Sequence, residues 1–294
     1  MKILNMGSLN IDYVYDVDHI ILPGETEATY GRNIFLGGKG INQSIALAKA
    51  GANVFHAGII GEDGHIFLDA CNKYGVNDKF IREVEGPSGH TIIQIDKNAQ
   101  NSILLFGGAN HKFTKEYVDE VLKKFNKGDY LLLQNEVNLL PYMVDKAYEK
   151  EMIIVFNPSP FNERIYNVDL KKISIFLLNE IEGKQITGQS NPNRILNKMQ
   201  EMFPKAKIVL TCGEDGATYA DEKNVIHQPI YKVKAIDTTA AGDTFTGYFI
   251  AGMMEGKNIS ELLRISAKAA SIAVTRKGAV NSIPNKEEVI NALE

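Results

Sequence analysis

The chain has little cysteine and no excess of basic charge. Its two cysteines, Cys71 and Cys212, lie in unrelated segments without metal-ligand spacing, so we expect reduced thiols and no cysteine metal site. With 32 basic and 36 acidic residues the formal net charge is −4, which gives no basic patch for a nucleic-acid partner. Residues 1–5 begin a strand where a signal peptide would place a longer apolar run, so we expect a cytoplasmic protein.

Two phosphate-binding signatures are also missing. The spacing G-x-x-x-x-G-K-[ST] does not occur, and no G-x-G-x-x-G follows a strand near the N-terminus. The second absence argues against a nucleotide-binding oxidoreductase. No low-complexity stretch or internal repeat is evident either. The 294 residues, 44% of them hydrophobic, can bury a large core, and one main domain with a small insertion fits this length.

Apolar runs and helical patterns alternate along most of the chain. Strands are expected at residues 3–7, 54–60, 130–134, 153–157, 175–178 and 208–211, and helices at 42–50, 65–73, 115–125, 141–149 and 193–203. Consecutive helices are expected at 259–275 and 286–293. This alternation predicts an α/β fold with a mostly parallel sheet covered by helices.

Two segments interrupt the alternation, residues 12–35 and 88–106. Both read as extended strands with turns, at Pro23-Gly24 and at Lys97-Asn98, and together they could form a small separate sheet. The main domain would then comprise residues 1–11, 36–87 and 107–294.

Residues 236–245 place small side chains directly before a carboxylate at the start of a helix. Backbone N–H groups around Ala240, Ala241 and Gly242 could approach an anion closely, and the helix N-terminus adds partial positive charge. Asp243 could accept a proton from an alcohol while these amides stabilise a transferring phosphoryl group. Alternatively, Asp243 is simply the N-cap of this helix.

Residues 36–44 also run from glycines into a helical pattern. Gly38 permits close backbone approach, and Lys39 and Asn42 are donors suited to a neutral polyol. A tight turn before an ordinary helix would explain the same residues.

These two segments resemble the signature motifs of the ribokinase family of sugar kinases. Further matches occur in the expected order over nearly the whole chain, at residues 7–12, 23–26, 61–64, 157–160, 179–182, 211–216 and 273–279. The resemblance implies a ribokinase-like three-layer α/β/α fold, with residues 12–35 and 88–106 as a β lid that covers the sugar site and forms the contact of a homodimer. A lid makes chemical sense because excluding water prevents wasteful ATP hydrolysis.

The resemblance also implies the sugar-binding residues. These are Asn10, Asp12, Gly38, Lys39, Asn42, Glu136 and Asp243. A carboxylate accepts hydrogen bonds from vicinal hydroxyls, while Asn and Lys donate to them. Outside the family context, Asp12 would be read as a lid-turn residue and Glu136 as a helix cap.

On the nucleotide side the resemblance implies ATP, Mg²⁺ and K⁺. ATP would contact Asn179, Glu182, Thr211, Gly213, Gly216 and Gly242, with Mg²⁺ held largely through water near Asn179 and Glu182. K⁺ would lie beside Asp237, Thr239, Ala273, Arg276, Gly278 and Ser282. Without the resemblance, residues 211–216 would be interpreted as an ordinary hairpin connection and Arg276 as part of a basic helix terminus. Cys212 could be oxidation-sensitive or a small buried apolar residue.

The implied reaction is ATP-dependent phosphorylation of the 5-hydroxyl of D-ribose, with Asp243 as general base. Ala240 departs from many members of the family, which have Gly there. The alternatives are a kinase of 2-deoxyribose, fructose or a related acceptor, and a non-catalytic sugar-binding regulator.

Overall fold

The computed structural model describes residues 1–98 and 100–294 and contains two β-sheets. The larger sheet has nine strands in the order β13-β12-β11-β10-β9-β8-β1-β4-β5. In chain order these are β1 (Ile3–Met6), β4 (Val54–Ile60), β5 (Asn77–Glu83), β8 (Tyr130–Gln134), β9 (Ile153–Asn157), β10 (Ile175–Asn179), β11 (Lys207–Thr211), β12 (Ala217–Ala220) and β13 (Val225–Gln228). All neighbours from β5 to β11 pair in parallel, while β11, β12 and β13 pair antiparallel.

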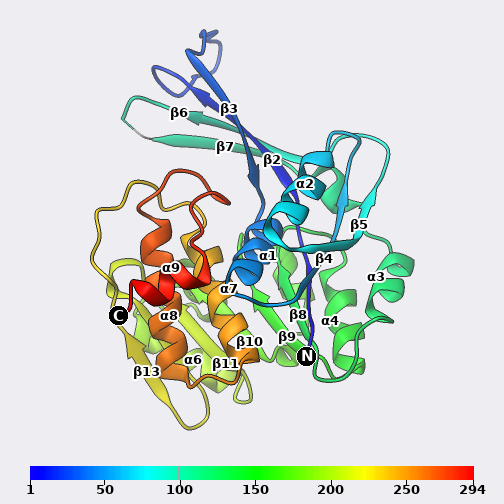
Figure 1. Cartoon of the computed structure of the whole chain (residues 1–294), viewed down its shortest axis with the longest axis vertical. Coiled ribbons are helices and arrows are strands. Elements are labelled where there is room, and N and C mark those ends of the chain that lie inside the picture. The colour runs from blue at the N-terminus through cyan, green and yellow to red at the C-terminus, as the bar shows by residue number, and fades with distance from the viewer. Residues whose placement is uncertain (99) are drawn as a thin grey trace.

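Helices cover both faces of this sheet (Figure 1). One face packs against α1 (Lys39–Lys49), α2 (His65–Tyr74), α7 (Ala241–Met254), α8 (Ile259–Ala273) and α9 (Lys286–Asn291). The other packs against α3 (Lys115–Leu122), α4 (Leu140–Glu149), α5 (Glu180–Thr187) and α6 (Pro192–Met202). The three-layer α/β/α prediction is therefore confirmed.

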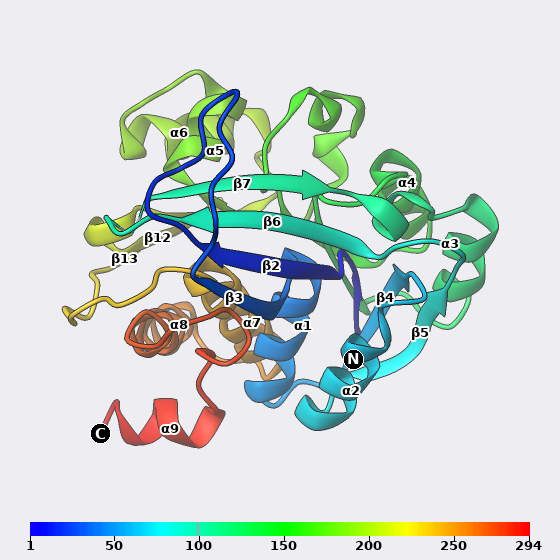
Figure 2. The same cartoon turned by 90° about the horizontal axis from the view of Figure 1, so that it is seen from above.

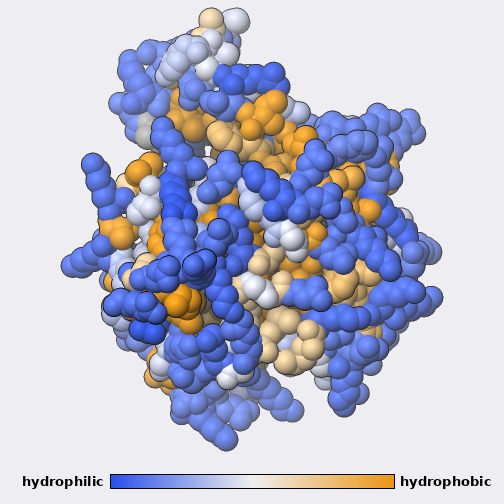
Figure 3. All heavy atoms as spheres, viewed as in Figure 1, coloured by the Kyte–Doolittle hydropathy of each residue, from blue (hydrophilic) through white to orange (hydrophobic). Residues whose placement is uncertain are grey.

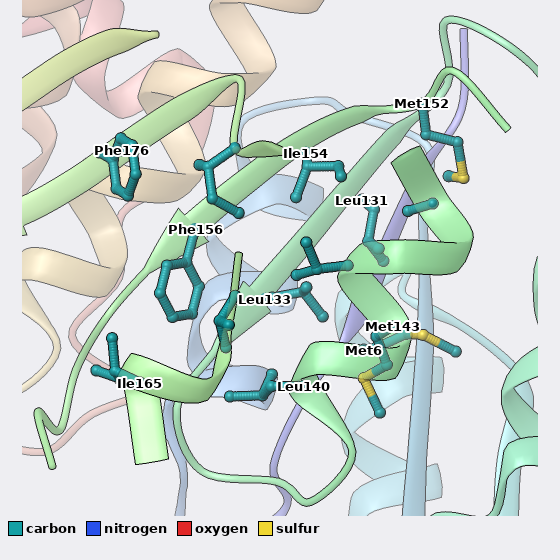
Figure 4. Close-up of a cluster of buried hydrophobic side chains, with 14 of the residues drawn as sticks. Met6, Leu131, Leu133, Leu140, Met143, Met152, Ile154, Phe156, Ile165 and Phe176 are labelled. Carbon is teal, nitrogen blue, oxygen red and sulfur yellow. The ribbon is translucent and has the colours of Figure 1, made fainter. Parts of the chain in front are cut away.

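Alternation along the buried strands divides the core into two clusters. In β1, Ile3 faces the cluster beneath α1 and α7, whereas Leu4 and Met6 face the cluster beneath α3 and α4. Figure 4 shows the second cluster, where Met6 lies near Met143 and Leu140 of α4. Strands that are buried on both faces consist of continuous apolar residues, so their positions could be predicted from the sequence.

Several elements differ from the sequence-based expectation. Strand β5, the antiparallel edge β12–β13 and helix α5 were not predicted, because β5 is half exposed and polar and the other three elements are short. Helix α1 begins three residues before the expected residue 42, and α7 begins at Ala241 rather than Asp243. In the described part of the chain, no helix combines the length and hydropathy needed to span a membrane.

The second sheet lies over one end of the first and has the order β3-β2-β6-β7 (Figures 1 and 2). Its strands are β2 (Asn10–Asp16), β3 (Gly31–Gly37), β6 (Gly89–Ile95) and β7 (Asn101–Phe106), and we call this sheet the lid. The sequence correctly predicted a small separate sheet from these two segments. The segment between β2 and β3 is mostly a loop rather than strand.

The lid stands above the point where the strand order of the main sheet reverses. Strand β1 has β4 on one side and β8 on the other, so the connections leaving their carboxyl ends diverge and leave a crevice. Since β1 continues almost directly into β2, the same chain segment supplies the floor of this crevice and part of its cover.

Candidate active site

A cavity of about 1100 Å³ is lined by the carboxyl ends of the central strands and by the lid. The structure brings most of the residues predicted from the sequence into its wall. They are Asn10, Asp12, Gly38, Lys39, Asn42, Glu136, Asn179, Glu182, Thr211, Asp237, Thr239, Ala240, Gly242, Asp243 and Gly278. Residues from seven separate chain segments therefore share one cavity large enough for two small-molecule substrates.

Six predicted residues lie outside that lining: Ala241, Gly213, Gly216, Ala273, Arg276 and Ser282. Gly213 and Gly216 have positive φ and shape the hairpin turn between β11 and β12, as the plain hairpin interpretation also required. Arg276 pairs with Glu288 of α9, and the Ser282 hydroxyl donates to the Ala279 carbonyl.

Asp243 lies in the first turn of α7 but does not cap the helix. The N-cap is Ala240, so the simple N-cap interpretation of Asp243 was wrong. The buried Asp243 carboxylate instead accepts hydrogen bonds from Asn42 Nδ2 at 3.1 Å and from Gln43 Nε2 at 2.8 Å. Both donors come from α1, so the two signature segments meet at this carboxylate.

The start of α7 leaves amide groups free of intrahelical acceptors. Its first helical bond runs from Thr244 N to Ala240 O, so the three preceding N–H groups have no partner within the helix. The Ala241 N–H donates to Thr238 O at 3.2 Å, which leaves those of Gly242 and Asp243 for a ligand. Ala240 has φ 59°, a left-handed conformation that glycine adopts at lower cost.

The glycines at the start of α1 serve two different purposes. Gly38 has φ 93° and lines the cavity as the N-cap of α1. A Cβ on Gly40 would lie 2.3 Å from Ser8 N and 2.5 Å from Gly7 C. Gly40 therefore allows α1 to pack against the backbone after β1, and the expected close approach to a ligand applies only to Gly38 and Lys39.

Lys39 and Glu136 form the charged side of the cavity. Glu136 accepts a hydrogen bond from Lys39 N at 2.8 Å and another from the Ser8 hydroxyl. Burial raises the pKa of Glu136, although Lys39 opposes this. Burial alone would lower the pKa of Lys39, but Asp243, Glu136 and Glu182 together raise it above its ordinary value. The ammonium group therefore stays charged among these carboxylates.

Asp12 projects into the cavity from strand β2 of the lid, not from a turn. Burial raises the pKa of Asp12 to about 6, and the nearby Glu136 adds to this, while a hydrogen bond from Thr91 Oγ1 at 2.6 Å opposes it. Thr91 is the register partner of Asp12 on β6. The lid therefore supplies a carboxylate whose pKa lies well above the ordinary range of aspartate.

Asn10 is held in place by a buried neighbour. Asn110 Nδ2 donates to Asn10 Oδ1 at 2.7 Å, while Asn110 Oδ1 accepts from Leu9 N at 2.9 Å. Because Asn10 Oδ1 is occupied, its amide nitrogen is the group available to a ligand.

Asn179 and Glu182 form the capping box of α5. Asn179 Oδ1 accepts from Glu182 N at 3.0 Å, and Glu182 Oε2 accepts from Asn179 N at 2.9 Å. This local role does not exclude a ligand role, since both side chains also line the cavity.

Asp237 links two loops beside the start of α7. Its carboxylate accepts from Thr239 N at 2.9 Å and from Gly278 N at 2.8 Å. Burial alone would raise the pKa of Asp237, but these hydrogen bonds and the charge of Lys277 lower it. Asp237 therefore remains an anion that draws the segment after α8 toward α7.

Three contributors were missed as functional side chains: Ser8, Gln43 and Thr91. Ser8 and Gln43 lie inside the quoted motifs, but their partners Glu136 and Asp243 are 128 and 200 residues away in sequence. The alternation of β6 could have indicated that Thr91 faces the same side as Ile93 and Ile95.

Comparisons with known proteins agree with this geometry. Residues 1–286 match the pfkB family carbohydrate kinase model. Over 298 residues, the chain is 33% identical to ribokinase of Haemophilus influenzae, covering 98% of this chain and 97% of that protein. Deoxyribokinase of Salmonella typhi is 28% identical, covering 98% and 97%. The structure of Arabidopsis thaliana ribokinase complexed with ribose and ATP superposes with a TM-score of 0.87 at 28% identity, covering 100% and 98%.

The fold and the cavity thus define a kinase that transfers phosphate to a sugar hydroxyl. The chain belongs to the pfkB family of carbohydrate kinases.

Proposed function

We propose that this enzyme phosphorylates the 5-hydroxyl of D-ribose, giving D-ribose 5-phosphate and ADP. The observation that carries the proposal is the placement of Asp243. Its carboxylate lines the cavity, is held by Asn42 and Gln43, and adjoins the amides at the start of α7. Ribokinases are among the relatives whose full length the chain matches.

In this mechanism Asp243 accepts the proton of the sugar hydroxyl. The hydroxyl oxygen forms a bond to the γ-phosphorus of ATP as the bond to the bridging oxygen breaks, and ADP leaves. The N–H groups of Gly242 and Asp243 stabilise the negative charge on the transferring group, aided by the partial positive charge of the helix start. Lys39, held charged by three carboxylates, adds a positive charge to the same cavity.

The sugar would bind in a polar ring below an apolar ceiling. Asn10, Asp12, Lys39, Asn42 and Glu136 line the lower cavity, and Asn42 Oδ1 is buried without a hydrogen-bond partner in the described structure. A sugar hydroxyl would satisfy that acceptor. The lid residues Val14, Ile93, Ile103 and Leu105 form the apolar ceiling and would set which sugars fit.

Mg²⁺ fits the donor set near Asn179 and Glu182. Both oxygens of the buried Glu182 carboxylate already accept hydrogen bonds from Asn179, so water would mediate the contact with the ion. When bound, the ion neutralises charge on the phosphates of ATP.

K⁺ fits beside Asp237, where two loops converge. The backbone N–H groups of Thr239 and Gly278 already donate to Asp237, so the backbone carbonyls of these two residues would be the main oxygen ligands, while Arg276 and Ser282 are occupied elsewhere. A cation there would hold the loop that precedes α7.

The lid suggests how two subunits would associate. The register places Ile34, Tyr13, Ile92 and Leu104 side by side across the four strands, on the face away from the cavity. Ile34, Ile92 and Leu104 are exposed, and Figure 3 shows hydrophobic residues around the lid. We propose that this apolar row is the homodimer contact, with residues 12–35 and 88–106 acting as the lid domain.

The proposal includes a cytoplasmic location with reduced thiols, supported by the two buried, free cysteines. Burial raises the pKa of Cys212 to about 11, which favours the inert thiol over an oxidation-sensitive thiolate.

Phosphorylation of 2-deoxyribose is the second candidate reaction, favoured by the similarity to a deoxyribokinase. A catalytically silent sugar-binding regulator would have no need for the buried Asp243.

The Asp243→Asn variant tests the mechanism. We expect turnover to fall by at least about 10³-fold while calorimetric ribose binding stays close to wild type. Near-normal turnover of this variant would remove Asp243 as the base.

A further inference from the structure

The side chains behind Asp243 form a continuous chain of hydrogen bonds. Gln43 Nε2 donates to Asp243 Oδ1 at 2.8 Å, and Gln134 Nε2 donates to Gln43 Oε1 at 2.7 Å. The second hydrogen of Gln134 Nε2 reaches Asn5 Oδ1 at 3.0 Å. Asn5, Gln43 and Gln134 are almost completely buried, with exposed fractions of 0%, 0% and 1%. We call Gln43 and Gln134, with the side chains that hold them, the amide relay.

The orientation of the Gln43 amide is fixed by two acceptors. Besides Asp243, Gln43 Nε2 faces Asn157 Oδ1 at 3.4 Å. Asn157 must present its oxygen there, because its own Nδ2 donates to the Leu177 carbonyl at 2.8 Å. Reversing the Gln43 amide would set oxygen against oxygen at both contacts.

The orientation of the Gln134 amide is fixed in the same way. Asn5 Nδ2 donates to the Gly40 carbonyl at 2.7 Å, so Asn5 Oδ1 is the atom that faces Gln134. The hydrogen bonds of the amide relay therefore have a single possible orientation. It is fixed by the backbone carbonyls of Leu177 and Gly40, which accept from Asn157 and Asn5. Gln134 Nε2 donates to Gln43, and Gln43 Nε2 donates to the Asp243 carboxylate.

This arrangement leaves one buried acceptor unpaired. Gln134 Oε1 has no hydrogen-bond partner in the described structure and lies where a Cβ on Gly7 would be only 2.4 Å away. An unpaired buried oxygen costs stability. An apolar side chain could fill this space without leaving an oxygen unpaired. A glutamine at position 134 therefore indicates that the hydrogen bonds donated by its Nε2 matter.

Neither Gln43 nor Gln134 lines the cavity, so neither is placed to touch the sugar or ATP. Both lie close to cavity residues in the chain, since Gln43 follows Lys39 on α1 and Gln134 ends β8 just before Glu136. The charged groups that face Asp243 across the cavity are Lys39 and Glu136.

We propose that Gln43 and Gln134 are positioning residues for phosphoryl transfer. The amide relay ties Oδ1 of Asp243 back to α1 and β8, leaving Oδ2, beside Asn42, to accept the proton of the sugar hydroxyl. This inference rests on the proposed role of Asp243 as base.

The test is the pH dependence of kcat and of KM for the sugar and ATP, measured for the full-length enzyme. For Gln43→Met we expect kcat to fall about tenfold or more, because a hydrogen bond to a charged group is lost. Both KM values should change by less than about twofold, because Gln43 does not line the cavity. Gln43→Glu keeps the shape but sets a carboxyl group against Asp243, so the acid limb of kcat should move to higher pH.

Gln134→Met tests the second step of the amide relay. Gln43 keeps its bond to Asp243 but loses the hydrogen bond that its Oε1 accepts from Gln134, so we expect a smaller fall in kcat, about threefold, again with KM unchanged. Ser266→Ala is the matched control, since Ser266 is fully buried and donates only to Leu262 O within α8. It should lower the melting temperature without altering the kcat profile.

The outcomes separate this inference from the proposed function. If Asp243→Asn keeps near-normal turnover, the base assignment fails and the positioning role fails with it. If Asp243→Asn is inactive but folded Gln43→Glu and Gln134→Met show the wild-type kcat and acid limb, only the amide relay is overturned. Should Gln43→Met fail to fold, the other two variants still decide the question.

Discussion

Burial raises the pKa of Asp12 and the Thr91 hydroxyl opposes this rise, so removing that hydroxyl should change sugar binding in a pH-dependent way. The Thr91 hydroxyl donates to Asp12 Oδ1 at 2.6 Å and opposes the rise in the pKa of Asp12 caused by burial. We expect Thr91→Val, which keeps the shape and removes the donor, to raise this pKa further. Asp12 would then be protonated over a wider range of pH, and a protonated carboxyl group accepts less well from sugar hydroxyls.

The size of the effect follows from the hydrogen bond that is lost. A bond to a charged group contributes about 1.5–3 kcal/mol, and 1.36 kcal/mol corresponds to one pKa unit. From about 6, the pKa of Asp12 would move to about 7 or 8. The ionised fraction at pH 7 would fall from about nine tenths to between about a half and a tenth, raising the sugar Kd about two- to tenfold. At pH 9 the variant should bind nearly as the wild type does.

Calorimetric titration of the sugar from pH 5 to 9 measures this directly. Thr91→Ser keeps the donor and is the matched control, with a profile expected to follow the wild type. Asp12→Asn should bind weakly with little dependence on pH over this range. Superimposed binding profiles for Thr91→Val and the wild type would show that the Thr91 hydroxyl does not lower the pKa of Asp12.

Three further predictions concern stability and assembly. Burial lowers the pKa of His56 from 6.5 to about 4, so the unfolded state alone gains a proton between these pH values, and stability is lost as pH falls from 6.5 to 4 by about 3 kcal/mol. In urea unfolding, the free energy of unfolding of His56→Asn should lack this fall at low pH. Comparing the variant with the wild type at each pH cancels the opposite contribution of Asp12, which both proteins share. Parallel plots of unfolding free energy against pH would contradict the prediction. Gly247→Ala would place a Cβ 2.4 Å from that of Ala46, where α7 crosses α1, and should destabilise the fold by about 1–3 kcal/mol, measured as a lower melting temperature. An unchanged melting temperature would contradict that packing. Leu104→Asp should convert a dimer to a monomer in light scattering, and a variant that stays dimeric would move the contact away from the lid.

The sequence predicted the central strands well because their chemistry is local. Strands such as β8 and β10 are buried on both faces and appear as uninterrupted apolar runs. Strand β5 was missed because it alternates between half-buried and exposed polar residues. The pair β12 and β13 has only four residues in each strand, too few for a periodic pattern.

The site residues that lie in recognisable motifs could be predicted from the sequence. Roles that depend on contacts between distant segments could not. Lys39 and Asp243 follow from recognisable segments, and the structure places both in one cavity. The position of Gln43 was visible but its role was not, because that role depends on Gln134 and Asp243, which are 91 and 200 residues away. No local pattern reports such pairings.

The most direct test of the central claim is ADP release with ATP, Mg²⁺ and K⁺ across ribose, 2-deoxyribose, fructose, fructose phosphates and adenosine. We expect the highest kcat/KM for ribose, because the polar ring offers donors and carboxylates to a pentose that carries a 2-hydroxyl. Higher kcat/KM for another acceptor would contradict the assignment of ribose, and no ADP release with any sugar would contradict the kinase mechanism itself.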